Sequence, residues 1–121
     1  MLRLTEGFHC VFSSEPDMSL RAPDEKPLIA VEVKAGTDPA GALERLGAAM
    51  KSFENERSMN PRMKTVYVAS CITGEVRNRI DQTKPFDHTF LLPMLLSDAT
   101  TQKRFAGLFV KEIVGSRSGP E

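Results

Sequence analysis

Three side chains in the first third of the chain, those of Asp17, Glu32 and Lys34, are of the types that hydrolyse phosphodiesters. Two carboxylates on neighbouring strands repel each other unless a cation lies between them. Mg²⁺, with Mn²⁺ as a substitute, prefers oxygen ligands. A nearby ammonium can orient or deprotonate a water and offset charge in the transition state. The combination favours metal-assisted phosphodiester hydrolysis, although an isolated E-x-K pattern is more often a solvated strand face.

The apolar run over residues 28–35, LIAVEVKA, predicts the strand that positions two of these side chains. Side chains alternate along a strand, so Glu32 and Lys34 share one face with Leu28 and Ala30. The other face is apolar. We therefore expect the Glu32 carboxylate and the Lys34 ammonium to be neighbours.

A hairpin places the third side chain. Residues 22–27, APDEKP, hold two prolines around a charged centre and predict a turn between this strand and an earlier one over residues 17–21. A slip of one residue would move Asp17 to the other face, whereas a slip of two would keep the faces. With the turn centred between residues 24 and 25, the expected pairs are Met18 with Val31, Leu20 with Ile29, and Asp17 with Glu32.

The rest of the chain predicts alternating strands and helices. Asp38 and Pro39 are typical of a helix start, because Asp caps free N–H groups and Pro lacks the N–H that would be wasted there. The order indicates an α/β fold with a central mixed β-sheet flanked by helices. We expect one domain over residues 1–115 and a flexible tail over residues 116–121. Further strands are expected over residues 9–13, 64–71 and 89–92, and helices over residues 39–57, 73–82 and 98–114, with Gly115 past the end of the last.

Composition limits the class of protein. With 121 residues and 40% hydrophobic content, the chain can bury one ordinary core. Its formal net charge of zero gives no general attraction to polyanions. Cys10 and Cys71 stand alone, which argues against a disulfide framework or a zinc site. No apolar run reaches the roughly 20 residues of a membrane span and no signal segment follows Met1, so we expect a cytoplasmic protein with no membrane contact.

The sequence PD at residues 16–17, followed by EVK at residues 32–34 on the next strand, resembles the motif of the PD-(D/E)xK nuclease superfamily. EVKAGTD and the helix after it are similar to the catalytic region of type II restriction endonucleases. The likeness covers mainly residues 15–53. It implies a restriction-endonuclease-like core and a Mg²⁺-dependent endonuclease that cuts double-stranded DNA and leaves a 5′-phosphate.

The same resemblance implies roles for individual residues. Asp17 and Glu32, with the backbone carbonyl of Val33, would be metal ligands. Lys34 would orient the attacking water.

Four more residues have two interpretations each. Arg45 and Lys51, on the helix after the motif, are candidates for DNA-backbone contacts or active-site support, with a solvated helix face as the alternative. Glu6 and Glu15 are candidates for an additional upstream acid, with a plain surface role as the commoner alternative. A further set of basic residues either gathers into a phosphate-facing patch or is scattered over the surface: Arg57, Arg62, Lys64, Arg77, Arg79 and Lys84.

Other functions on this fold remain open. One is a different nuclease, such as a junction resolvase, repair nuclease or effector domain. Another is a non-catalytic DNA-binding or assembly module. Restriction endonucleases usually carry substantial recognition elements, whereas this chain reaches its catalytic strands almost at once, as a trimmed catalytic domain would. Because one core carries one such site and a double-strand cut needs two scissions, we expect a homodimer.

Overall fold

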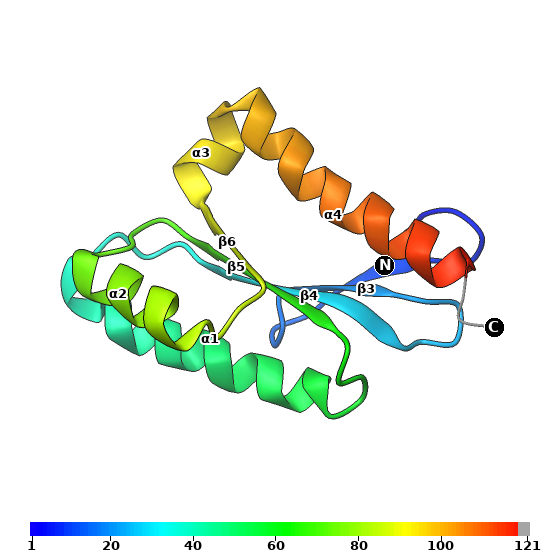
Figure 1. Cartoon of the computed structure of the whole chain (residues 1–121), viewed down its shortest axis with the longest axis horizontal. Helices are drawn as coiled ribbons and strands as arrows, with labels where there is room; N and C mark the ends of the chain where they lie inside the picture. Colours follow the sequence, from blue (N-terminus) through cyan, green and yellow to red (C-terminus); the bar gives the residue numbers. More distant parts are fainter. Residues whose placement is uncertain (119–121) are drawn as a thin grey trace.

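The protein has one six-stranded sheet, whose strand order follows the sequence from β1 to β6, and β-branched and aromatic residues are frequent in β4, β5 and β6. A computed structural model describes residues 1–118 (Figure 1). The strands β1 to β4 pair antiparallel, and β4, β5 and β6 pair parallel, so the sheet is mixed, as predicted. The strands are β1 Leu2–Arg3, β2 His9–Phe12, β3 Met18–Arg21, β4 Pro27–Lys34, β5 Lys64–Ala69 and β6 His88–Leu91.

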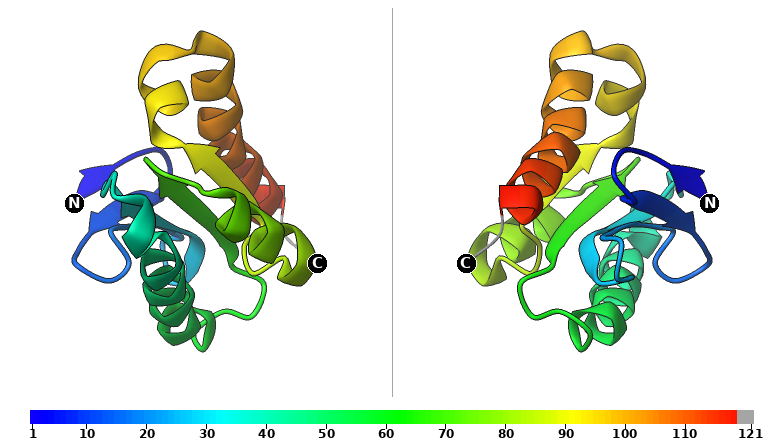
Figure 2. Two further views of the ribbon diagram at one scale, coloured as in Figure 1. Left: turned by 90° about the vertical axis from the view of Figure 1, so that its left-hand side faces the viewer. Right: turned by 90° about the vertical axis from the view of Figure 1, so that its right-hand side faces the viewer.

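Helices cover both faces of the sheet. The helices α1 and α2 lie on one face, and α3 and α4 lie on the other, which gives three layers (Figures 1 and 2). The predicted α/β fold, a central mixed sheet flanked by helices, is confirmed. No helix among residues 1–118 is long and apolar enough to cross a membrane. The helices are the 3₁₀ turn η1 Pro39–Gly41, α1 Ala42–Arg57, α2 Gly74–Thr83, α3 Leu92–Ser97 and α4 Ala99–Ser118.

Local capping fixes where the helices after β4 and β5 begin. The Asp38 side chain accepts a hydrogen bond from the Ala40 N–H at 3.1 Å, with Pro39 next to it, as the sequence predicted. The Thr73 hydroxyl accepts from the Val76 N–H at 3.2 Å and begins α2. The turn η1, which leads into α1, and the helix α2 therefore start after the C-terminal ends of the parallel strands β4 and β5, at the end of the sheet where Lys34 lies.

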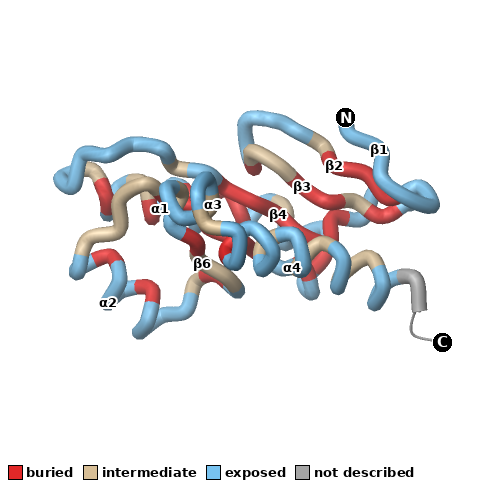
Figure 3. The backbone as a smooth tube through the Cα atoms, turned by 90° about the horizontal axis from the view of Figure 1, so that it is seen from above, coloured by how far each residue is buried: buried red, intermediate tan, exposed pale blue. Residues whose placement is uncertain are grey.

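The core has one cluster on each face of the sheet. Under α1, the buried stripe of Leu46, Ala49 and Phe53 packs on the strands. Under α4, the apolar residues Phe105, Leu108 and Phe109 are only half-buried, so this helix closes its face less completely. Figure 3 shows the contrast between the buried strands and the exposed outer surface of α3 and α4.

The predicted hairpin register is confirmed, with Met18 paired to Val31 and Leu20 to Ile29. A bulge follows, because Arg21 pairs with Pro27 and leaves Leu28 as an extra residue. The extra residue breaks the alternation, so Leu28 packs in the same cluster as Ile29 and Val31. The prediction that Leu28 shares a face with Ala30 was wrong for this reason.

The C-terminal third departs from the predicted pattern at two points. The strand predicted over residues 89–92 ends at Leu91, because Leu92 begins α3 and Pro93 occupies the first turn of that helix, where its missing N–H costs nothing. Gly115 lies inside α4, which continues to Ser118. Residues 116–118 of the expected flexible tail are therefore helical, and residues 119–121 lie outside the described residues.

Candidate active site

Asp17, Glu32 and Lys34 lie together at the end of the sheet where β4 finishes. Continuing the hairpin register by one residue beyond Met18 and Val31 sets Asp17 opposite Glu32. The Lys34 Nζ lies 3.7 Å from Glu32 Oε1, so these two side chains share a face. The structure thus brings the three predicted side chains into one site, and these three residues are called here the trio.

Pro16 explains why this end of the hairpin is open. The same register would set Pro16 opposite Val33, but proline has no N–H to donate to the Val33 carbonyl. The Val33 N–H instead donates to Asp17 Oδ2 at 2.7 Å. Because the N–H and C=O of one strand residue point to the same edge, the Val33 carbonyl points toward the Asp17 side without a ladder donor from Pro16. The PD sequence therefore leaves a backbone oxygen beside the carboxylates.

Glu32 is the most unusual side chain of the site, since it is only 1% exposed. Burial raises the pKa of this carboxyl to about 7, and the neighbouring Asp17 carboxyl also raises it, whereas the Ser52 hydroxyl and the Lys34 ammonium lower it. Its Oε2 has no hydrogen-bond partner among residues 1–118. A buried carboxylate oxygen without a partner is costly and calls for a ligand.

These residues fit a divalent cation. Asp17 and Glu32 supply carboxylate oxygens and Val33 supplies a carbonyl oxygen, which is the donor set that Mg²⁺ uses when it keeps several waters. No group of three or more His, Cys, Asp or Glu side chains suited to a metal occurs in the described part of the chain. Neither Glu6 nor Glu15 therefore completes a three-residue cluster with the two carboxylates.

The Lys34 side chain stands at the boundary between interior and solvent. It is 27% exposed, while its partner Glu32 is buried. Its backbone is held by the Ser70 N–H, which donates to the Lys34 carbonyl at 3.0 Å. The ammonium can therefore contact a water or a phosphate at the surface while it remains close to the buried carboxylate.

Arg45 supports the loop that follows Lys34. Its guanidinium donates to the Asp38 carbonyl. A Cβ placed on Gly36 or Gly41 would lie 2.8 or 2.7 Å from Arg45 Nη1, so the loop wraps closely around this side chain. Of the two predicted roles, this geometry favours active-site support.

Lys51 is exposed on α1 and makes no side-chain hydrogen bond or ion pair with the residues described. Its neighbour Ser52 faces the sheet, so Lys51 points about 100° away around the helix. The structure does not bring Lys51 into contact with the trio.

Two residues near Glu32 were not predicted. Tyr67 pairs with Glu32 in the β4–β5 register and stacks on Phe86 with ring centroids 4.7 Å apart. Ser52 is 2% exposed and its hydroxyl lies where it affects the Glu32 carboxyl. The sequence feature that could have identified Ser52 is its position as a small polar residue directly before Phe53, inside the apolar stripe of α1.

The predicted basic residues fall into separate groups at other parts of the surface. Arg57, Arg62 and Lys64 line a hollow at the start of β5, whereas Arg77 and Lys84 line another beside α2. Lys64 pairs with Ile29, five positions before Lys34, so it lies roughly 16 Å along the strand from the end that holds the trio.

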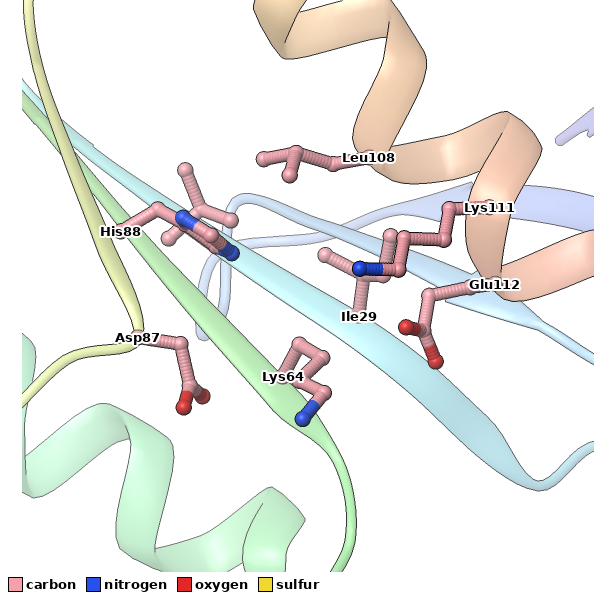
Figure 4. A pocket seen from close by; sticks show the side chains of 8 residues that line it. Ile29, Lys64, Asp87, His88, Leu108, Lys111 and Glu112 are labelled. Atoms are coloured by element: carbon pink, nitrogen blue, oxygen red, sulfur yellow. The ribbon is translucent and has the colours of Figure 1, made fainter. Parts of the chain in front are cut away.

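A hollow of about 520 Å³ also lies at this far end, between α4 and the sheet (Figure 4). It has an apolar floor and a charged rim, and it contains no member of the trio. Its lining residues are Ile29, Lys64, Val66, Asp87, His88, Leu108, Lys111 and Glu112.

Comparison with known proteins gives one match. No curated protein and no solved structure matches the chain. A family model described as XcyI restriction endonuclease matches residues 7–107, a span that runs from before β2 into α4 and includes the whole trio. The match agrees with the resemblance to type II restriction endonucleases and PD-(D/E)xK nucleases. The chain belongs to the XcyI restriction endonuclease family.

Proposed function

We propose that this protein is a Mg²⁺-dependent endonuclease that hydrolyses phosphodiester bonds of double-stranded DNA. The observation that carries the proposal is the buried Glu32 carboxylate, whose Oε2 has no partner among the described residues and which lies beside Asp17 and Lys34. Lys34 approaches Oε1, at 3.7 Å, and leaves Oε2 without a partner, and a buried polar atom without a partner destabilises the fold unless a ligand completes it. Family membership supports DNA as the substrate.

Asp17, Glu32 and the Val33 carbonyl would hold the cation. When bound, the ion supplies Lewis-acid polarisation of a phosphate oxygen. The Val33 N–H holds Asp17 in place through its bond to Oδ2, so the carboxylate does not have to be ordered when the substrate arrives.

Lys34 would act on the attacking water and on the phosphate. Its partly exposed ammonium can orient a water for in-line attack on phosphorus and stabilise the negative charge that develops on the phosphate oxygens. The P–O bond to the 3′ oxygen then breaks, which leaves a 5′-phosphate and a 3′-hydroxyl. Arg45 contributes indirectly by holding the loop after β4, and exposed Lys51 remains a candidate contact to the DNA backbone.

Cleavage of both DNA strands would require two copies of the chain, since each carries one such trio. A symmetric pair is the commonest arrangement for this purpose. Sedimentation on duplex DNA tests this part, and a strict monomer that makes concerted double-strand breaks would contradict it.

A plasmid assay tests the proposed activity. We expect Mg²⁺-dependent nicking and linearisation of supercoiled DNA by the wild type, and none by Asp17→Asn or Glu32→Gln. Asp24→Asn, at the tip of the hairpin turn, is the matched carboxylate control and should cut normally. Cleavage by Glu32→Gln at the wild-type rate would refute the proposal. A strong preference for four-way junctions over linear duplex would instead favour a junction resolvase.

A further inference from the structure

Helix α1 carries polar side chains on the face that it buries. Ser52 is 2% exposed and lies among the apolar residues Leu46, Ala49 and Phe53. A hydroxyl in such a stripe loses its hydration and needs a hydrogen-bond partner. The Ser52 Oγ has none of standard geometry within residues 1–118.

A complementary group lies across the same interface. Helix α1 packs on β4, where Glu32 Oε2 is also buried and lacks a hydrogen-bond partner in the described structure. The Ser52 hydroxyl can rotate to donate a hydrogen bond. The Glu32 carboxylate, when ionised, accepts hydrogen bonds and donates none. The Ser52 hydroxyl also favours the charged form of the Glu32 carboxyl. The two unsatisfied groups thus suit each other.

The next turn of α1 fixes the neighbouring strand. Glu56, four residues after Ser52, accepts from Arg21 Nη2 at 2.9 Å, and Arg21 Nε donates to the Ser19 hydroxyl at 3.1 Å. Ser19 and Arg21 belong to β3, the strand that Asp17 precedes. One face of α1 therefore contacts both strands of the hairpin that carries the two carboxylates.

We propose that Ser52 is a positioning residue whose hydroxyl donates to the Glu32 carboxylate and holds it in the orientation that a divalent cation needs. The inference rests on the proposed function, because it takes Glu32 as a metal ligand. Hydrogen-bond partners of metal ligands typically change metal affinity 10- to 100-fold when removed. We expect a loss of about tenfold here, since one hydroxyl of one ligand is involved.

A Mn²⁺ titration monitored by electron paramagnetic resonance tests the inference, because it measures metal binding and does not depend on cleavage. Ser52→Ala should bind Mn²⁺ about tenfold more weakly than the wild type. Ser52→Cys keeps the volume but offers only a weak donor, so it should behave in the same way and serves if the alanine variant folds poorly. Ser58→Ala removes an exposed hydroxyl from the end of the same helix and should bind like the wild type. Glu32→Gln should not bind.

Plasmid cleavage separates positioning from direct catalysis. The Mn²⁺ concentration for half-maximal cleavage by Ser52→Ala should rise about tenfold, while the rate at saturating Mn²⁺ stays within about threefold of the wild type. Folded Ser52→Ala and Ser52→Cys chains that bind Mn²⁺ as tightly as the wild type would overturn the inference alone. A wild-type chain that binds no Mn²⁺ would overturn the proposed function as well.

Discussion

The polar groups at the two ends of β4 differ in whether they have hydrogen-bond partners. At the start of the strand, Asn60 Nδ2 donates to the Pro27 carbonyl at 2.8 Å, and its Oδ1 accepts from the Arg62 N–H at 3.1 Å. Nearby, the Asp87 carboxylate accepts from the Thr65 N–H at 2.8 Å. The buried Asn60 side chain and Thr65 N–H thus have hydrogen-bond partners, and so stabilise the fold. Glu56 Oε2, beside Arg21, has no partner among the described residues, but the other oxygen of that carboxylate is paired with Arg21 at 2.9 Å.

At the other end of β4, the pattern is reversed. Glu32 Oε2 and the Ser52 hydroxyl are buried and lack partners among the described residues, and Asp17 lies next to a second carboxylate instead of a cation. An end that is incomplete in this way destabilises the folded chain until a ligand arrives. The comparison therefore separates polar groups that stabilise the fold from the Glu32 carboxylate, which we propose binds a metal with support from Ser52.

The largest expected effect is on catalysis, from Lys34→Met. The substitution keeps the length of the side chain and removes its charge, so cleavage should fall by about 100-fold or more while the chain stays folded. Mn²⁺ affinity should hold or rise, because a cation beside Glu32 is lost. Rates from a plasmid assay check this, with Lys64→Met at the opposite end of the sheet as the control. A folded Lys34→Met chain that cuts DNA at the wild-type rate would show that the trio is not catalytic.

The second effect is a pH dependence of stability without metal. The Glu32 carboxyl has a pKa of about 7 in the folded chain against an ordinary 4.5, so its contribution is full below about pH 4.5 and is lost as the pH rises through 7. The difference corresponds to about 3 kcal/mol in the free energy of unfolding. Urea denaturation across this range should show the loss in the wild type, and Glu32→Gln should remove it. Mg²⁺ should restore stability near pH 8. Identical pH profiles for wild type and Glu32→Gln would contradict this prediction.

The third effect is on stability and comes from Asn60, at the start of β4. Asn60→Ala removes the donor to the Pro27 carbonyl and should lower the free energy of unfolding by about 1–3 kcal/mol. Because Asn60 lies away from the trio, the cleavage rate per folded molecule should stay unchanged. Denaturation curves and active-site-normalised rates check both parts. If Asn60→Ala lost metal binding but kept its stability, the proposed difference between the two ends of β4 would be wrong.

The smallest expected effect is that of Arg45→Ala. The guanidinium holds the loop after Lys34, so its removal should misplace that loop and slow cleavage about tenfold. Stability should change by less than about 1 kcal/mol, since the side chain is half exposed. Glu54→Ala, an exposed change on the same helix, is the control. If Arg45→Ala cut DNA at the wild-type rate, the proposed role of Arg45 in supporting the site would be wrong.

The sequence predicted the trio because the information needed was local. Alternation along residues 28–35 put Glu32 and Lys34 on one face, and the turn over residues 22–27 set the register that the structure has at Met18 and Val31. Turn residues and strand period act over a few positions, so one sequence suffices to read them. The role of these residues in catalysis stays a prediction.

Features that depend on contacts between distant elements were not predictable in this way. The bulge at Arg21 changes the face of Leu28, and nothing in the alternation indicates it. Ser52 affects the pKa of the Glu32 carboxyl only because α1 packs on β4. The start of α3 at Leu92 was not predicted, because the Pro93 that follows is compatible both with a strand end and with a helix start.

Calorimetric titration with Mn²⁺ tests the central claim most directly, namely that the incomplete end of β4 is a metal site. The wild type should bind the ion between Asp17 and Glu32, and the double variant Asp17→Asn, Glu32→Gln should lose that binding because both charged ligands are gone. Equal binding by the wild type and the folded double variant would contradict the claim.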